Sequence, residues 1–295
     1  MQSVLDSCRF VYNKMLEGLR KQEKPDSSAL QNSIPKIKTE NPDLSQVYSK
    51  VLQYECYRLF SNLRALTKLK KNGKKVGRLR FKGKEWFKTF VYNQSGFHLI
   101  STGKRYQKLY LSKIGEIPMR VHREVDGKMK QVTVKKYPSG KWYVSISVEC
   151  EKDNSRLHAE KATKAVGIDL GIMHFASDSV GNHVNNPKFM TVGFEGFKVL
   201  QQILSRKKKG SANRQKQRIK VARQFEKIYN QRNDFLHKLS RHYVNSHDII
   251  AVEALEIRNN QNIIQCKKHK RCILVKILTD AGLQGCECRY PVGKG

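Results

Sequence analysis

The period of the hydrophobic pattern changes along this 295-residue chain, and those changes limit its possible folds more than any other feature. In LDSCRFVYNKMLEGLRKQ apolar residues recur every three or four positions, and the same spacing returns near residue 44 after a KPDSS turn, which predicts helices. From residue 90 to 150, short runs such as KQVTVKKY and KWYVSISVEC alternate in polarity between DG and SG turns, which predicts strands. We therefore expect a helical region at residues 1–75 and a β-rich, barrel-like domain with a basic loop at residues 76–160.

A further domain is predicted after the charged stretch EKDNSRLHAEKATK, which we interpret as a linker. It opens with AVGIDLGIMHFASDSVG at residues 165–181, a short apolar run that predicts a buried strand, and DIIAVEAL predicts another. Between them lies a long basic helical segment at residues 197–245. One face of this helix is predicted to hold Val221, Phe225, Ile228, Arg232, Phe235, Leu239 and Tyr243. The predicted fold class is α+β or α/β, with this domain at residues 165–295.

The charge of the chain is strongly unbalanced, with 58 lysines and arginines against 25 acidic residues and a formal net charge of +33. Such an excess repels itself in a compact state unless a polyanion neutralises it, so nucleic acid is the expected partner. An acidic membrane surface is the rival partner. However, no run approaches the roughly 18 apolar residues of a spanning helix, and no segment has the pattern of a signal peptide.

Two stretches concentrate the positive charge. Residues 64–88 contain eleven lysines or arginines and one acid, and residues 206–223 contain nine and no acid. Cations bind phosphates, and the interleaved Phe81, Trp86 and Phe87 could stack on unpaired bases, although core packing explains these rings equally well. The predicted nucleic-acid-binding residues are Lys74, Lys75, Arg78, Arg80, Lys82, Arg206, Lys207, Lys208, Lys209, Arg214 and Arg218.

Each of the two apolar strands of the last domain carries one acid, Asp169 in GIDLG and Glu253 in IAVEA. A buried carboxylate is costly unless it is paired or bound to a cation, and two that converge can hold Mg²⁺ for phosphodiester cleavage. Gly167 and Gly171 would let backbone or a phosphate approach Asp169 closely. The alternative is structural, with Asp169 capping a turn and Glu253 paired with an arginine.

The order of these motifs resembles the TnpB (OrfB) family, the accessory "transposase" proteins of bacterial and archaeal insertion sequences. The resemblance is carried by GIDLGIMHFA, by the basic segment SRKKKGSANRQKQRIKVARQFEKIYNQRNDFLHKLSR and by IIAVEAL, and also by CRFVYN, GRLRFK and GKWYVSISVE. It runs from about residue 4 to about residue 285. The family is related to compact type V CRISPR effectors.

The resemblance implies a RuvC-type nuclease domain with an RNase H-like fold, preceded by a β-barrel wedge domain with a helical insert. It also implies a guide RNA, Mg²⁺-dependent DNA cleavage associated with DNA transposition, and a four-cysteine zinc site. Asp169 matches the first RuvC acid and Glu253 the second, so these two residues are the predicted catalytic and metal-binding residues. Residues 205–241 match the basic helical segment that lies along nucleic acid.

The chain departs from the family pattern at both ends. It begins inside a helix that the family reaches after an initial strand, and neither the paired CxxC motif nor the third catalytic Asp follows Glu253. Asp280 fits a turn cap better than a third acid. The later cysteines and histidine lack C-x₂-C zinc spacing: Cys266, His269, Cys272, Cys286 and Cys288. We therefore expect a chain truncated at both ends, without the zinc site and catalytically impaired.

Two functions of different class stay open. The first is an RNA-guided or DNA-directed endonuclease in which Asp169 and Glu253 hold Mg²⁺. The second is a nuclease-dead DNA- or RNA-binding protein, repressor-like, that uses the same fold; retention of both acids speaks mildly against it. Seven scattered cysteines do not form a disulfide framework, which favours a reducing cytoplasmic compartment in a prokaryote, with nucleoid association.

Overall fold

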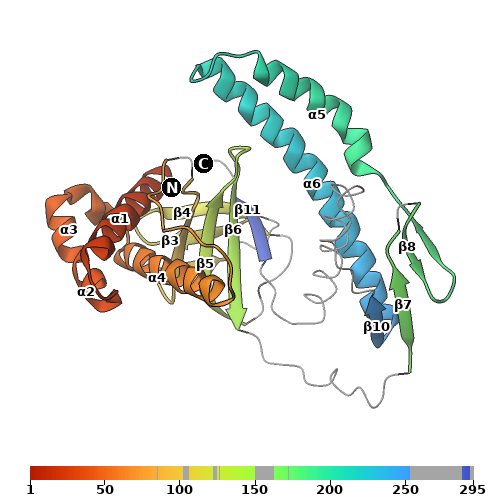
Figure 1. Cartoon of the computed structure of the whole chain (residues 1–295), viewed down its shortest axis with the longest axis horizontal. Coiled ribbons are helices and arrows are strands. Elements are labelled where there is room, and N and C mark those ends of the chain that lie inside the picture. The colour runs from red at the N-terminus through yellow and green to blue at the C-terminus, as the bar shows by residue number, and fades with distance from the viewer. Residues whose placement is uncertain are drawn as a thin grey trace. The chain divides into compact units, whose positions relative to one another are not determined.

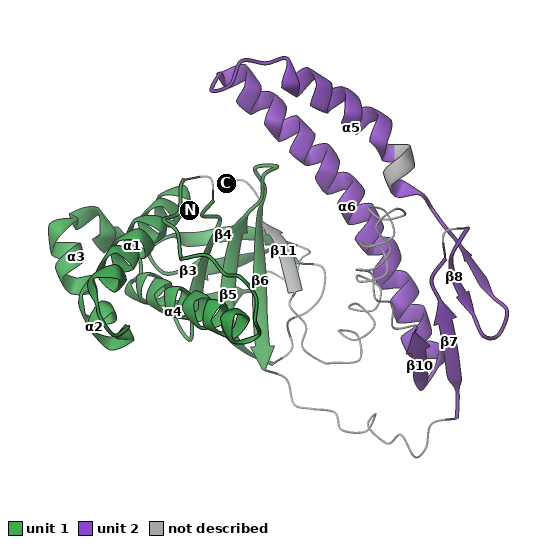
Figure 2. Cartoon of the chain, in the orientation of Figure 1, with its two compact units in different colours: residues 1–150, 287–295 green, residues 151–286 purple. Residues whose placement is uncertain are grey.

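The computed structural model of the chain comprises two compact units, unit 1 of residues 1–150 and 287–295 and unit 2 of residues 151–286 (Figures 1 and 2). The structure describes residues 1–84, 86–101, 106–121, 125, 127–149, 163–171, 173–252 and 288–292. Most of the predicted linker lies outside these residues. Across the described residues, no helix is both long and apolar enough to cross a membrane.

The N-terminal part of unit 1 is helical, as its periodicity predicted. Helix α1 (Gln2–Lys21) buries the predicted apolar positions Leu5, Cys8, Tyr12, Met15 and Leu19. Three short elements, α2 (Ser27–Asn32), α3 (Ile34–Glu40) and the 3₁₀ helix η1 (Pro42–Gln46), precede the long helix α4 (Ser49–Lys71). The KPDSS stretch, predicted as a turn, also starts α2, because the Asp26 carboxylate accepts the backbone N–H of Ser28 at 2.8 Å and caps the helix.

The β-rich part of unit 1 is one seven-stranded antiparallel sheet, in the order β1-β5-β6-β11-β4-β3-β2. Within the described strands, no pairing joins the edge strands β1 and β2, so the predicted barrel is an open sheet. Strand β11, which was predicted to belong to the domain at residues 165–295, pairs here with β6 and β4. The strands are β1 (Thr89–Asn93), β2 (Phe97–Ile100), β3 (Tyr106–Leu111), β4 (Gly115–Arg120), β5 (Lys128–Lys136), β6 (Trp142–Glu149) and β11 (Cys288–Val292).

The helices and the sheet of unit 1 share one hydrophobic core, in which α1 and α4 pack against the sheet (Figure 2). The ring of Tyr48 stacks on Tyr92 of β1, with 5.7 Å between ring centroids. Arg58 of α4 donates from Nη1 to the carbonyl of Thr89 at 3.1 Å. The period-two alternation of β5 and β6 places Val132, Val134, Val144 and Ile146 in the same core.

Unit 2 combines a four-stranded sheet, in the order β10-β7-β8-β9, with a helical hairpin (Figure 1). Strands β10 and β7 are parallel, whereas the β7–β8 and β8–β9 pairs are antiparallel. The chain therefore leaves β7 through the β8–β9 hairpin and returns beside β7 only after two helices. The elements are β7 (Ala165–Asp169), β8 (His174–Asp178), β9 (His183–Asn185), α5 (Phe189–Ser205), α6 (Ala212–Ser246) and β10 (Ile249–Val252).

Only part of the predicted apolar face of α6 is buried. Leu239 and Tyr243, together with Leu236, pack on the sheet, and Ile228 is buried in the N-terminal half of the helix. Phe225 is 51% exposed, which the periodicity did not anticipate. Within the described residues the sheet packs on the C-terminal half of α6, whereas the N-terminal half packs on α5, which leaves Phe225 partly exposed.

Candidate metal and nucleic-acid-binding sites

Asp169 is the last residue of β7, and its side chain is exposed. Val166 and Ile168 point the other way, into the core beneath α6. The sequence predicted a buried strand, but the described sheet is covered on one face only, so β7 is half-buried. The carboxylate of Asp169 thus incurs little desolvation cost, and within the described residues no hydrogen bond or ion pair engages it.

Polar side chains continue across the sheet from Asp169. Ser177 of β8 lies opposite Asp169, and directly opposed residues of an antiparallel pair point to the same face. The Ser177 hydroxyl lies 3.0 Å from Nδ1 of His183, whose ring stacks on His174 with centroids 4.7 Å apart. Sequence reasoning missed this row, because strand pairing rather than sequence spacing brings its members together.

The parallel pairing of β10 with β7 brings the carboxyl ends of these two strands side by side. Val252 lies opposite Ile168, and in the sequence these residues directly precede Glu253 and Asp169. Glu253 itself lies outside the described residues. The other end of the pair is fixed by Asp248, whose carboxylate accepts the backbone N–H groups of Thr163 at 3.1 Å and Lys164 at 3.2 Å. These hydrogen bonds lower the pKa of Asp248, and the one from the Lys164 backbone has the largest effect.

The two glycines that flank Asp169 have different surroundings. A Cβ on Gly171 would lie 2.9 Å from the carbonyl oxygen of His174, so backbone approaches closely there. A Cβ on Gly167 would make only ordinary contact, 3.7 Å from the Cβ of Ser179. The expected close approach of backbone is therefore found at Gly171 and not at Gly167.

The Gly171→Ala substitution is expected to destabilise the β7–β8 hairpin by roughly 1–3 kcal/mol, because the added methyl group overpacks against immobile backbone. Gly167→Ala is the matched control, since its methyl group has room. Hydrogen–deuterium exchange of peptides that cover residues 165–178 measures the difference. Equal protection in the two variants would contradict the expectation.

The predicted basic residues of unit 1 lie on the extended segment that follows α4. Lys74, Lys75, Arg78 and Arg80 are exposed, and Lys82 is half-buried. The three interleaved rings differ: Phe87 is buried in the core, Phe81 is half exposed beneath the guanidinium of Arg20, and Trp86 is 82% exposed. Core packing therefore accounts for Phe87 but not for Trp86.

The predicted basic residues of unit 2 surround the turn between α5 and α6. Arg206, Lys208 and Lys209 are exposed, and Lys207 is half-buried. Arg214 has an internal role, because its Nη1 donates to the carbonyls of Leu204 at 2.8 Å and Lys207 at 2.9 Å. The long helical segment predicted at residues 197–245 is thus two helices, and Arg214 fastens the turn that separates them. Arg218 is exposed on α6.

No group of three or more His, Cys, Asp or Glu side chains that could hold a metal occurs among the described residues. Glu253, Cys266, His269, Cys272, Asp280 and Cys286 lie outside them, so the predictions made for these residues stay predictions. Cys8 and Cys56 are buried free thiols, and burial raises the pKa of both. Taken by themselves, the two units define a basic α+β protein with an exposed acid at the carboxyl end of a parallel strand pair.

Comparison with known proteins finds a matching family model and two similar proteins. Residues 145–263 match the family described as "Probable transposase" (OrfB_IS605). Over 128 residues the chain is 41% identical to a "Putative RNA-guided DNA endonuclease" of Streptomyces pristinaespiralis, covering 43% of this chain and 31% of that protein. Over 272 residues it is 29% identical to the "Putative RNA-guided DNA endonuclease InsQ" of Escherichia coli K12, covering 88% of this chain and 63% of that protein.

The matched part of this chain thus spans less than two thirds of the length of either relative. These matches support the TnpB (OrfB) family that the motifs indicated.

Proposed function

We propose that this protein binds nucleic acid and that Asp169 and Glu253 together hold Mg²⁺ beside the bound strand, as in an RNA-guided DNA endonuclease. One observation carries the proposal: β7 and β10 are adjacent and parallel, and the residues that precede the two acids lie opposite each other. Ligands of sheets with parallel strands commonly bind beyond the carboxyl ends of adjacent strands. An RNase H-like (RuvC) nuclease fold for unit 2 is part of the same proposal.

The character of Asp169 fits a magnesium ion. Mg²⁺ keeps several water molecules and is usually held by one or two carboxylates plus substrate phosphates. An exposed carboxylate at a strand end offers a hard oxygen ligand with room for those waters. When bound, such an ion supplies Lewis-acid activation of water and stabilises a leaving oxygen in phosphodiester hydrolysis. The residues of this chain would hold the ion and bind phosphates through their cationic side chains.

DNA and a guide RNA are the proposed partners, because both relatives are named as RNA-guided DNA endonucleases. The exposed cations of residues 74–80 and 206–209 supply the phosphate contacts that such partners need. Action of this protein on chromosomal DNA would place it at the nucleoid. A nuclease-dead binder is the second candidate, since the same exposed cations serve binding without cleavage.

A plasmid cleavage assay tests the proposal. The purified chain is incubated with supercoiled plasmid in Mg²⁺ or EDTA, beside the Asp169→Ala variant, and DNA and RNA binding is measured separately by fluorescence anisotropy. Metal-dependent cleavage that Asp169→Ala abolishes supports the endonuclease. Binding without cleavage in either metal condition supports the nuclease-dead candidate, in line with the expectation of catalytic impairment. Absence of binding would overturn both.

Replacing Lys207, Lys208 and Lys209 with glutamine is expected to weaken duplex binding and to flatten its salt dependence. Each lost phosphate contact lowers the slope of log K against log salt by about 0.9 for duplex DNA. Fluorescence anisotropy between 50 and 200 mM salt measures the slope. The matched control removes the same charge from Lys108, Lys130 and Lys238, which already pair with Glu116, Glu149 and Asp234. Equal slopes for the two triple variants would exclude the turn as a phosphate contact.

A further inference from the structure

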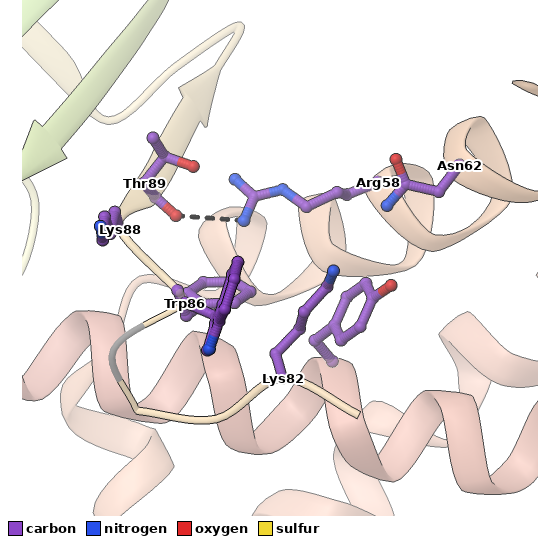
Figure 3. Close-up of a pocket in the computed structure, with 8 residues that line it drawn as sticks. Arg58, Asn62, Lys82, Trp86, Lys88 and Thr89 are labelled. Carbon is purple, nitrogen blue, oxygen red and sulfur yellow. Dashed lines mark hydrogen bonds between the residues drawn. The ribbon is translucent and has the colours of Figure 1, made fainter. Parts of the chain in front are cut away.

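A pocket of about 340 Å³ lies on unit 1 between α1, α4 and an extended segment, of which residues 82–84 and 86–89 are described (Figure 3). Its volume falls within the roughly 300–1,000 Å³ of pockets that take small molecules. Helix α4 contributes Arg58 and Asn62 from one side, and the extended segment contributes Lys82, Trp86 and Lys88 from the other (Figure 3). The rest of its lining comes from Tyr12, Phe87 and Thr89.

We propose that this pocket binds one unpaired nucleotide of a nucleic-acid strand, with its phosphate against the cations and its base against the indole of Trp86. The inference rests on the proposed nucleic-acid binding and adds the subsite that holds a single nucleotide. Neither Arg58 nor Asn62 belongs to the basic stretches that the sequence singled out as binding residues. Helix packing places them opposite Trp86.

The pocket is cationic. Arg58, Lys82 and Lys88 line it, and no acidic side chain does so among the described residues. Beneath it the buried Glu55 lies 3.2 Å from Nη1 of Arg58. Burial raises the pKa of Glu55 to about 8, against the opposing pull of Arg58, so near neutral pH this acid is mostly protonated and leaves the charge of Arg58 uncompensated. An anionic ligand is therefore favoured.

The donors of Arg58 are held in place for such a ligand. Its hydrogen bond to the Thr89 carbonyl and its contact with Glu55 both use Nη1, and its guanidinium lies over the ring of Phe87, 4.8 Å from the centroid. Within the described residues these contacts leave the N–H groups of Nε and Nη2 for a phosphate. A guanidinium fixed in this way can bind two phosphate oxygens at once.

Trp86 supplies the surface for a base. Its side chain is 82% exposed although the neighbouring Phe87 is buried, so core packing does not account for the indole. Base stacking on an exposed aromatic face is the usual means by which proteins hold unpaired nucleotides, and it tolerates any sequence. A paired base is already stacked on both faces, so the pocket favours single strands over duplex.

The inner end of the pocket offers hydrogen-bonding groups for a base edge. The Tyr12 side chain is 1% exposed, and its hydroxyl makes no hydrogen bond of standard geometry within the described residues. Burial raises the pKa of this hydroxyl, and the Asn62 amide beside it opposes the rise. A buried polar group without a partner is costly, and a ligand that reaches it would remove that cost.

The extended segment is fastened before any ligand binds. The Asn13 amide donates to the carbonyl of Lys82 at 3.0 Å and accepts the backbone N–H of Lys82 at 2.8 Å. Nearby, Arg20 donates from Nη2 to the carbonyl of Leu79 at 3.0 Å. A preorganised pocket loses less conformational entropy on binding than a flexible loop would.

Tryptophan fluorescence tests the proposal, because the chain has only two tryptophans, Trp86 and Trp142. In the Trp142→Phe variant Trp86 is the sole fluorescent tryptophan. Single-stranded DNA or RNA of ten nucleotides is expected to quench its fluorescence more than an equal concentration of duplex does. Trp86→Leu is expected to weaken single-strand affinity about tenfold, whereas Tyr106→Leu, at an exposed aromatic residue of β3, should leave it unchanged. Parallel titrations with inorganic phosphate and with a mononucleotide show whether the pocket prefers a strand to a free phosphate or a free nucleotide.

In the unmodified chain, ultraviolet crosslinking of 5-iodouracil oligonucleotides followed by peptide mapping is expected to find Trp86. This arm keeps the test valid if Trp142→Phe does not fold. Three results would each overturn the pocket while the proposed function stands. Strands could bind without quenching Trp86, they could bind Trp86→Leu with unchanged affinity, or they could bind without forming a crosslink at Trp86. Failure to bind any strand would overturn both, and tighter binding of free phosphate than of strands would overturn the pocket as a nucleotide subsite.

Discussion

Raising the pH from 5 to 9 is expected to destabilise unit 1 in the wild-type chain through Glu55, and this contribution should disappear in Glu55→Gln. Glu55 is fully buried on α4, beside Cys8 and Arg58. Burial raises its pKa from 4.5 to about 8, while Arg58 and a hydrogen bond from Cys8 act in the opposite direction. The folded state therefore retains a proton that the unfolded chain releases.

The sign of the effect follows from proton linkage. Between pH 4.5 and pH 8 the folded state binds more protons than the unfolded state, so the free energy of unfolding falls as pH rises. The stabilising contribution is complete below pH 4.5 and is lost as the pH passes through 8. At about 1.4 kcal/mol per pKa unit, Glu55→Gln should be more stable than wild type by a few kcal/mol at pH 9 and nearly equal to it at pH 4.5.

Urea unfolding followed by tryptophan fluorescence measures this difference, because both tryptophans lie in unit 1. Glu17→Gln is the control, because Glu17 lies at the surface of α1 and a hydrogen bond from Lys21 lowers its pKa, so loss of this carboxylate cannot reproduce the effect. A constant difference between wild type and Glu55→Gln from pH 5 to pH 9 would show that Glu55 is ionised throughout.

Asp169→Asn is expected to weaken divalent-metal binding at least about tenfold while leaving the fold intact. Loss of an outer-shell partner alone typically costs 10–100-fold in metal affinity, and a direct carboxylate ligand should cost no less. The fold should persist because the side chain is exposed and its strand neighbours Val166 and Ile168 keep their core contacts. The asparagine amide has nearly the same shape as the aspartate carboxylate but carries no charge.

Titration calorimetry with Mn²⁺ measures this affinity without requiring cleavage. Asp234→Asn is the matched control, since Asp234 is an exposed acid of unit 2 that pairs with Lys238 at 2.7 Å. Equal Mn²⁺ affinities for wild type and Asp169→Asn would show that Asp169 does not belong to the proposed metal site, and this result would leave the proposal of nucleic-acid binding unaffected.

Elements with a regular hydrophobic pattern were predicted well, and elements without one were not. The core positions of α1 and the alternating strands β5 and β6 follow directly from their periodicity. Strand β4 was missed, because Pro118 lacks an N–H group and argues against a strand within a sheet. Helices α2 and α3 are too short for a helical period to stand out.

The sequence singled out the candidate residues of the site but did not predict their surroundings. Asp169 stood out as an acid in an apolar run, but its exposure depends on which face of β7 the C-terminal half of α6 covers. Arg214 is indistinguishable in sequence from its basic neighbours, and only the fold shows that it holds the α5–α6 turn. Ser177 and His183 meet because β8 and β9 pair, as neither their types nor their spacing could show.

The sequence by itself determined the α+β class, the resemblance to the TnpB (OrfB) family and the basic character of the protein. Residue type and local spacing specify helices, strands and net charge without any distant contact. The tertiary structure alone decided that Asp169 is exposed, that the predicted barrel is an open sheet, and that Arg58 and Asn62 lie across a pocket from Trp86. These features depend on packing between segments that are far apart in the chain, and local spacing carries no information about such contacts.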